Sequence, residues 1–359
     1  MISKRYTNIF LFNLIILNFC AYAEVEYTDY AIPELVTSPR SLAMGNANFG
    51  EDFGPHTIFL NPASKLPVRR YKLGLITMNG ELNSDTLDKT FGEKGLSFKS
   101  FEQGIDFLSQ SNMRNALLKE DGGILFQRFG VTSYVQLKRL MIGYFSSHFL
   151  NGALKSINDT FYGNRREDFG PFINYTALIS RKLLLGLTYA YLHRSETLGE
   201  IQSDGTSNVQ RRDGITNHLT IGLKYQISRT FIFSLVSRDA LSGTYFATDN
   251  DGGPMNDPNT IDVAGTLFAS RNKLKINLAL RDITGKYEAD TSRKVQLGVE
   301  IASNRNSGYQ LGFLDGGFTA GYYYKTKKYG TFSFATYDVN SEVTEVVDRD
   351  RRLVIEYTL

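Results

Sequence analysis

From about residue 69 to the end of the chain, hydrophobic and polar residues alternate with a period of two. The segments 219–227, 275–281 and 353–359 each place apolar side chains on every second position. In 295–301, one face carries Val295, Leu297, Val299 and Ile301, and the other carries Gln296, Gly298 and Glu300. Because successive side chains of a strand point to opposite faces, this pattern predicts strands whose two faces meet different surroundings.

The length of the apolar faces favours a membrane barrel over a soluble sandwich. They run for roughly nine or ten residues, which suits a tilted strand that crosses a bilayer, whereas soluble strands more often have about 5–6 residues. The opposite faces hold glycines and small hydrogen-bonding residues, among them Gly186, Thr188 and Gly222, as a crowded barrel interior requires.

The connections support the same interpretation, because tight turns and long polar loops alternate along the chain. Tight turns are expected at Lys138, 181–182, 228–229, 271–272 and 304–306. The expected strands are 71–80, 122–137, 139–151, 169–180, 183–193, 215–227, 230–238, 260–270, 273–283, 294–302, 307–314, 317–326, 329–338 and 350–359. Residues 69–359 are therefore predicted to form an all-β transmembrane antiparallel β-barrel of about 14 strands in a bacterial outer membrane, with both chain ends in the periplasm.

The first 23 residues have the features of a secretory signal peptide. Lys4 and Arg5 precede a short apolar stretch, and Ala21-Tyr22-Ala23 provides a cleavage site. Cys20 invites a lipoprotein interpretation, but bulky Phe19 stands where such signals need a small residue. The mature chain is then expected to begin at Glu24 without cysteine, which excludes disulfides from it.

Composition narrows the function further. The formal net charge of +3 is small and evenly spread, so nucleic acid is not an expected partner. Tryptophan, which is common where barrels meet the membrane surface, is absent, and the 21 tyrosines are expected to replace it. The interface candidates are Tyr189, Tyr191, Tyr225, Tyr245, Tyr322, Tyr323, Tyr324 and Tyr357.

Residues 24–68, between the signal and the first strand, do not alternate and are rich in small residues, Gly and Pro. Unpaired backbone groups are costly in lipid, so such a segment is expected to lie in the barrel lumen as a plug. Its pattern S-x-R-x-x-x-M-G-x-A (38–47), followed by N-P-A (61–63), resembles the N-terminal hatch of the FadL-like long-chain fatty acid transporter superfamily. Residues 295–300, 311–313 and 316–322 resemble the closing hairpins of its branch related to type IX secretion carrier barrels.

The resemblance implies a plugged passive channel for hydrophobic compounds, with outer-membrane lipid and hydrophobic small molecules as partners. It makes Asn61, Pro62 and Ala63 the hatch turn, with Met44 and Gly45 at its entry. An N-P-A that merely ends a helical turn is the alternative. The alternative function is a non-transport scaffold that holds secreted or surface proteins through its extracellular loops.

The loop after the first strand has a helical apolar pattern through Phe91, Phe101, Ile105 and Leu108. The resemblance makes these residues a lid for an apolar ligand. A helix that packs on the barrel rim to bury its own apolar side explains the pattern equally well.

No catalytic, cofactor or metal site is predicted, and the protein is expected not to be an enzyme. Strand parity places His193 outside and His218 inside, so they should not share a metal. Residues 249–253 with Asp257 resemble a calcium loop, but their spacing does not complete an EF-hand. The predicted inward charges could bond to the plug or simply line the wall; they are Lys224, Lys275, Arg281, Glu300 and Glu356.

Overall fold

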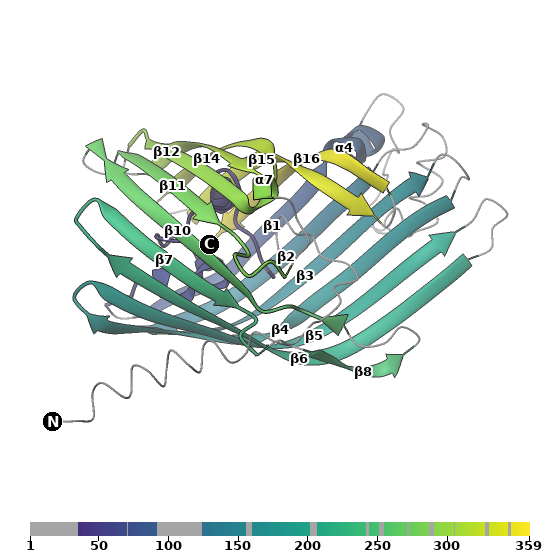
Figure 1. Cartoon of the computed structure of the whole chain (residues 1–359), viewed down its shortest axis with the longest axis horizontal. Helices are drawn as coiled ribbons and strands as arrows, with labels where there is room; N and C mark the ends of the chain where they lie inside the picture. Colours follow the sequence, from purple (N-terminus) through teal and green to yellow (C-terminus); the bar gives the residue numbers. More distant parts are fainter. Residues whose placement is uncertain are drawn as a thin grey trace.

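The computed structural model shows a barrel that surrounds the N-terminal part of the chain (Figure 1). It describes residues 35–69, 71–91, 124–155, 160–201, 207–241, 244–250, 255–270, 273–286, 291–304, 306–326, 330–343 and 346–359. No helix within these ranges has the length and apolar character needed to cross a membrane. The predicted signal peptide lies outside the described residues.

Fourteen strands close into an antiparallel ring, which confirms the predicted number. The ring strands are β1 (Tyr71–Asn83), β2 (Ile124–Leu137), β3 (Leu140–Lys155), β4 (Thr160–Ser180), β5 (Leu183–Ile201), β6 (Ser207–Gln226), β7 (Phe231–Arg238), β10 (Thr260–Ala269), β11 (Leu274–Leu280), β12 (Val295–Ala302), β13 (Ser307–Leu314), β14 (Gly317–Thr326), β15 (Gly330–Val343) and β16 (Val346–Thr358). Each strand pairs with the strands before and after it in this list. The ring closes where β1 pairs with β16, with Met78 opposite Tyr357. Closure pairs both edges of the sheet and leaves none exposed to lipid.

Two further strands lie where a loop was predicted. β8 (Thr244–Asn250) pairs with the outer part of β6, and β9 (Met255–Asn256) pairs with β8. The prediction of loop structure for 239–259 was therefore wrong in part. Polar, Gly-rich residues suggested turns, but β6 extends to Ser207 and offers β8 a pairing edge beyond the end of β7.

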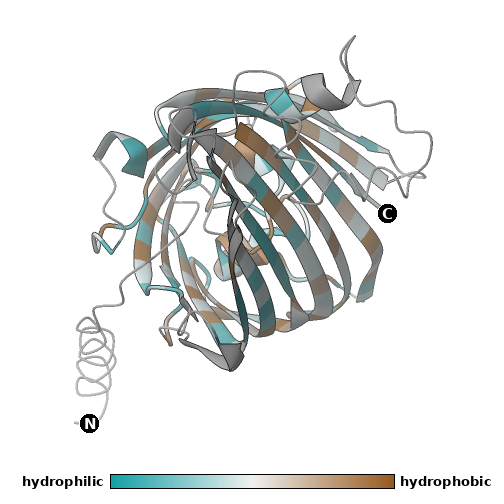
Figure 2. Cartoon of the chain, turned by 90° about the vertical axis from the view of Figure 1, so that its right-hand side faces the viewer, coloured by the Kyte–Doolittle hydropathy of each residue, from teal (hydrophilic) through white to brown (hydrophobic). Residues whose placement is uncertain are grey.

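The apolar faces of the strands point outward. In β2 the burial alternates strictly from Phe129 to Leu137, and the odd-numbered residues are exposed. In β6, Tyr225 is exposed while Thr220, Gly222 and Lys224 are buried, as predicted. Figure 2 shows hydrophobic and hydrophilic residues alternating along the strands. This outer surface suits contact with lipid.

Most of the tyrosines predicted for the interface are exposed or partly exposed on the outer face, including Tyr189, Tyr191, Tyr225 and Tyr357. Tyr323 is a correction, because it is buried and its ring lies beneath the plug residue Arg40 inside the barrel. Tyr322 and Tyr324 lie on the outer face. Because side chains alternate between the two faces of a strand, Tyr323 between them points into the lumen.

Residues 35–68, here called the luminal segment, lie inside the ring as far as Lys65, and residues 66–68 lead to β1 beside the turn at Lys138. They contain α2 (Pro39–Leu42), α3 (Thr57–Leu60) and the 3₁₀ turn η1 (Pro62–Ser64). Two other short helices flank strands outside this segment, α4 (Ser84–Phe91) and α7 (Thr291–Lys294). The apolar cores of the molecule form where the luminal segment meets the inner faces of the strands.

Candidate functional site

The predicted hatch entry, Met44 and Gly45, is fully buried against the wall of β12 and β13. Gly45 has φ +63°, and a Cβ there would lie 2.2 Å from the Leu297 carbonyl oxygen, so only glycine fits this turn. On the wall side, a Cβ at Gly298 would lie 2.3 Å from the Met44 carbonyl oxygen. Thr319 accepts a hydrogen bond from Gly45 N (3.2 Å) and donates one to the Ala43 carbonyl (2.8 Å).

The predicted hatch turn, Asn61-Pro62-Ala63, lies against β5 and β6. Asn61 Oδ1 accepts a hydrogen bond from Ala63 N (3.0 Å), and its Nδ2 donates to the Phe49 carbonyl (2.7 Å). Glycines in the wall again leave space for the turn. A Cβ at Gly186 would lie 2.1 Å from the Pro62 carbonyl carbon, and a Cβ at Gly222 would lie 2.1 Å from Asn61 Oδ1. Both groups of hatch residues therefore contact the wall, at places separated around the ring by β7, β10 and β11.

A charged network links the luminal segment to β11–β13. Arg40 donates two hydrogen bonds to Glu300, from Nε (2.9 Å) and from a terminal nitrogen (2.8 Å). Lys275 bridges Glu300 (2.7 Å) and Glu51 (2.8 Å). Burial alone would lower the pKa of the Arg40 guanidinium, but the Glu300 carboxylate more than offsets burial, so the pKa is raised and Arg40 stays charged.

A second polar contact joins His56 to the opposite part of the wall. His56 Nδ1 lies 2.8 Å from Glu356 Oε2, and Nε2 lies 3.2 Å from Thr132 Oγ1. Glu300, Lys275 and Glu356 thus bond to the luminal segment, which favours the first interpretation of the inward charges. Arg281 lies over the Phe49 ring at 5.8 Å, and Lys224 is buried in the wall.

The lumen also contains an apolar surface that the sequence did not predict. Phe59 of the luminal segment packs edge-on against Phe145 of β3 and Phe172 of β4, both with ring centroids 5.4 Å apart. Further buried apolar residues surround this trio: Leu35, Val36, Ile58, Tyr134, Met141, Ala190 and Leu192. The inner faces therefore carry aromatic residues as well as the glycines and small hydrogen-bonding residues named from the sequence. The inward parity of Phe145 and Phe172 is the signal that could have found the apolar surface.

The proposed lid residues are only partly described. Residues 84–91 form helix α4, as the apolar spacing predicted, and Phe91 is its last residue. Phe101, Ile105 and Leu108 lie outside the described residues. The lid therefore stays a prediction.

Two of the four histidines lie near the middle of β5 and β6. His193 stacks on Phe169 with centroids 4.6 Å apart, and His218 is buried inside, as parity predicted. His218 does not approach His193 as a ligand but lies close to Asp239 and Asp257, within reach of a shared metal ion. This group lies close to α3. Arg238, the residue before Asp239, donates a hydrogen bond to the carbonyl of Phe59 in α3 (3.0 Å).

No family model and no curated protein matches the sequence. Solved structures do match in fold. The Ralstonia pickettii toluene transporter TbuX is 14% identical with a TM-score of 0.52, and the match covers 90% of this chain and 97% of TbuX. The Pseudomonas putida toluene transporter TodX is 11% identical, with a TM-score of 0.52 and coverage of 89% and 96%. A Pseudomonas aeruginosa FadL homologue is 10% identical, with a TM-score of 0.50 and coverage of 91% and 98%.

These matches, together with the closed fourteen-strand ring and its internal N-terminal segment, define the class of the fold. The chain has the FadL-like barrel fold, which the sequence motifs had indicated. At this level of identity the likeness establishes the architecture, and the role of the barrel has to be argued from the residues of this chain.

Proposed function

We propose that this protein is a passive outer-membrane channel for hydrophobic compounds, stoppered by the luminal segment, and that it is not an enzyme. The observation that carries the proposal is the apolar surface of Phe59, Phe145 and Phe172 inside the ring. A purely polar lumen would offer an apolar solute no favourable contact, whereas this surface does. The toluene transporters of the same fold support the choice of monoaromatic compounds as first candidates.

Displacement of α3 would expose the apolar surface. Phe59 is the part of the luminal segment that covers Phe145 and Phe172. An apolar solute that took the place of Phe59 would therefore contact the same two aromatic rings. Met44, Gly45, Asn61, Pro62 and Ala63 hold the segment on two sides and act in this proposal as its attachment points.

The solute must then leave for the lipid or the periplasm. The pairing of β4 with β5 is interrupted at Gly170 and Pro171, between the Phe169–His193 and Phe172–Ala190 pairs. Proline has no N–H to donate to a ladder, so this is a weak point of the wall next to the apolar surface. We place a lateral exit there.

Uptake by intact cells tests the proposal. A strain that lacks the gene should take up radiolabelled toluene and long-chain fatty acid more slowly than a strain that carries it. Equal uptake by the two strains would exclude the channel. A loss of surface proteins without a change in uptake would favour the scaffold instead.

A variant pair connects uptake to the apolar surface. We expect Phe145→Ser to lower uptake several-fold, because a hydroxyl replaces the aromatic contact inside the lumen. Phe129→Ser is the matched control, since Phe129 is 47% exposed on the outer face. If the two variants took up toluene and fatty acid at the same rate, transport would not depend on the apolar surface of Phe59, Phe145 and Phe172.

The second candidate is a scaffold for secreted or surface proteins, as the resemblance to the type IX secretion branch suggests. It is supported by the outer parts of β4 and β6, whose outward residues Arg165, Glu167 and Arg211 are polar. Such a wall stands in water and could hold a protein partner. The relationship to that branch remains part of this second proposal.

A further inference from the structure

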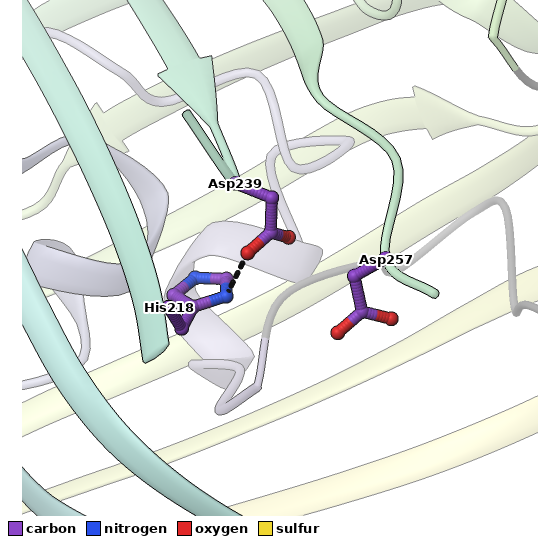
Figure 3. Close-up of side chains that lie close together, drawn as sticks. All are labelled: His218, Asp239 and Asp257. Carbon is purple, nitrogen blue, oxygen red and sulfur yellow. Dashed lines mark ion pairs between the residues drawn. The ribbon is translucent and has the colours of Figure 1, made fainter. Parts of the chain in front are cut away.

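Three side chains from separate parts of the chain converge inside the barrel. His218 comes from β6, Asp239 directly follows β7, and Asp257 lies between β9 and β10 (Figure 3). One potential ligand atom from each lies within 4.8 Å of the others. His218 and Asp239 are buried, and the Asp257 side chain is 16% exposed.

The backbone at Asp239 is unusual and helps to form this group. Asp239 has φ +45°, in the left-handed region that residues other than glycine seldom adopt. Strand β7 ends at Arg238, and Asp239 begins the turn that follows. There the Asp239 carboxylate contacts the His218 ring. The cluster therefore depends on a local conformation that costs free energy.

The two ring nitrogens of His218 have different partners, and these partners determine which nitrogen is available to a metal ion. Its Nε2 lies 3.2 Å from Thr220 Oγ1, and its Nδ1 contacts Asp239 Oδ1. A neutral imidazole that donates from Nε2 to Thr220 carries a lone pair on Nδ1, directed at a carboxylate. In the other neutral tautomer Nδ1 donates to Asp239 and Nε2 accepts from Thr220; a metal ion that takes the place of the proton between Nδ1 and the carboxylate is held by both ligands.

The charges around the group favour a cation. Arg194 bonds to Asp257 (2.9 Å) and to Asp168 (2.6 Å), and Arg166 also bonds to Asp168 (2.7 Å). The carboxylates of Asp168, Asp239 and Asp257 and the two guanidinium groups sum to −1 with a neutral His218 and to 0 once the imidazole is protonated, so a metal cation at Nδ1 would supply the positive charge that the proton otherwise brings. Buried negative charge is costly, and a bound cation relieves the cost.

We propose that His218, Asp239 and Asp257 bind a divalent transition-metal cation of the zinc class. One imidazole nitrogen and two carboxylate oxygens form a ligand set that suits zinc and leaves a position for water, whereas calcium and magnesium take oxygen ligands. Two ligand atoms on one tetrahedral zinc ion lie roughly 3.3 Å apart, so the contact between His218 and Asp239 must open, and Asp257 must adjust, when the ion binds. Thr220 is the group that orients the imidazole.

The proposed site differs from the sequence-based expectation of no metal site. That prediction weighed His218 against His193 and judged Asp257 by its spacing from residues 249–253 alone. The two carboxylates that meet His218 are far from it in sequence, and the pairing of β6 with β7 brings them together. The bound ion would connect β6, the end of β7 and the start of β10.

Zinc binding by the purified full-length protein in detergent tests the proposal. After treatment with a chelator, wild type should bind one equivalent of Zn²⁺ in a calorimetric titration. We expect His218→Ala to weaken binding by at least about 100-fold, and Asp257→Asn to weaken it while the acceptor for Arg194 is kept. His148→Ala is the matched control, because His148 pairs with Glu167 on an exposed part of β3 and should leave affinity unchanged.

A second measurement separates a metal site from a simple ion pair. Co²⁺ should give the visible absorption of a low-symmetry nitrogen–oxygen site in wild type, and Thr220→Val should lower Zn²⁺ affinity by roughly 10–100-fold. Heat-modifiable gel mobility identifies variants that retain the barrel. The proposal is overturned if wild type binds no zinc, or if folded His218→Ala or Asp257→Asn binds it as tightly as wild type.

Discussion

At the scale of single residues, the interior is shaped by glycines that allow two backbones to touch. Gly298 and Gly312 lie beneath Met44 and Gly45, and Gly186 and Gly222 lie beneath Pro62. Each stands on the polar face of a strand, where the alternation of the sequence already placed it. The pattern indicated that these positions face inward, but only the structure shows that they contact a chain segment rather than water.

We expect Gly298→Ala to loosen the luminal segment without unfolding the barrel. The new Cβ would lie 2.3 Å from the Met44 carbonyl oxygen, and such overpacking typically costs about 1–3 kcal/mol. The conductance of single channels in planar bilayers should rise. Gly80→Ala is the control, because its Cβ would lie 3.4 Å from the Phe129 ring; equal conductance of the two variants would contradict the close packing at Gly298.

At the scale of elements, the strands were predictable and the luminal segment was only partly so. Period-two alternation located the strands β1–β7 and β10–β16, because each strand separates an apolar face from a polar one. The outer ends of β3–β6 were missed, since beyond the apolar band both faces are polar and the alternation disappears. Bonding of Glu300 and Glu356 to the plug was one of the two interpretations of the inward charges, but their partners Arg40 and His56 could not be named, because they are distant in sequence.

Deletion of residues 35–66 should leave a folded but open barrel. The ring closes through β1 and β16 without the luminal segment, and water can hydrate Glu300 and Lys275 once the segment is gone. We expect heat-modifiable mobility to persist while the influx of small polar solutes into liposomes rises. A deleted chain that never acquires heat-modifiable mobility would show that the segment is needed for folding.

At the scale of the whole molecule, stability depends on which face meets lipid. Leu311 is 60% exposed in the apolar band of β13, between Tyr309 and Phe313. This placement follows from closure of the ring, which turns the long apolar faces of the strands outward.

Leu311→Arg is therefore expected to destabilise the folded barrel in lipid by about 2–4 kcal/mol, the cost of arginine near the bilayer midplane. Gln226→Arg serves as the control, because Gln226 is exposed at the end of β6 near the turn. Urea titration in vesicles measures both variants. Similar midpoints for the two would argue that the face bearing Leu311 is in water.

The unequal lengths of the strands have a consequence for how solutes arrive. β4 has 21 residues and β11 has 7, a difference of roughly 45 Å along the strand direction, and Figure 1 shows the long strands gathered on one side. The rim is therefore slanted, with its low side at β10–β14. If the protein is the channel proposed above, this low side would lie close to the headgroups of the outer leaflet, and an oily molecule dissolved in that leaflet would reach the mouth sideways.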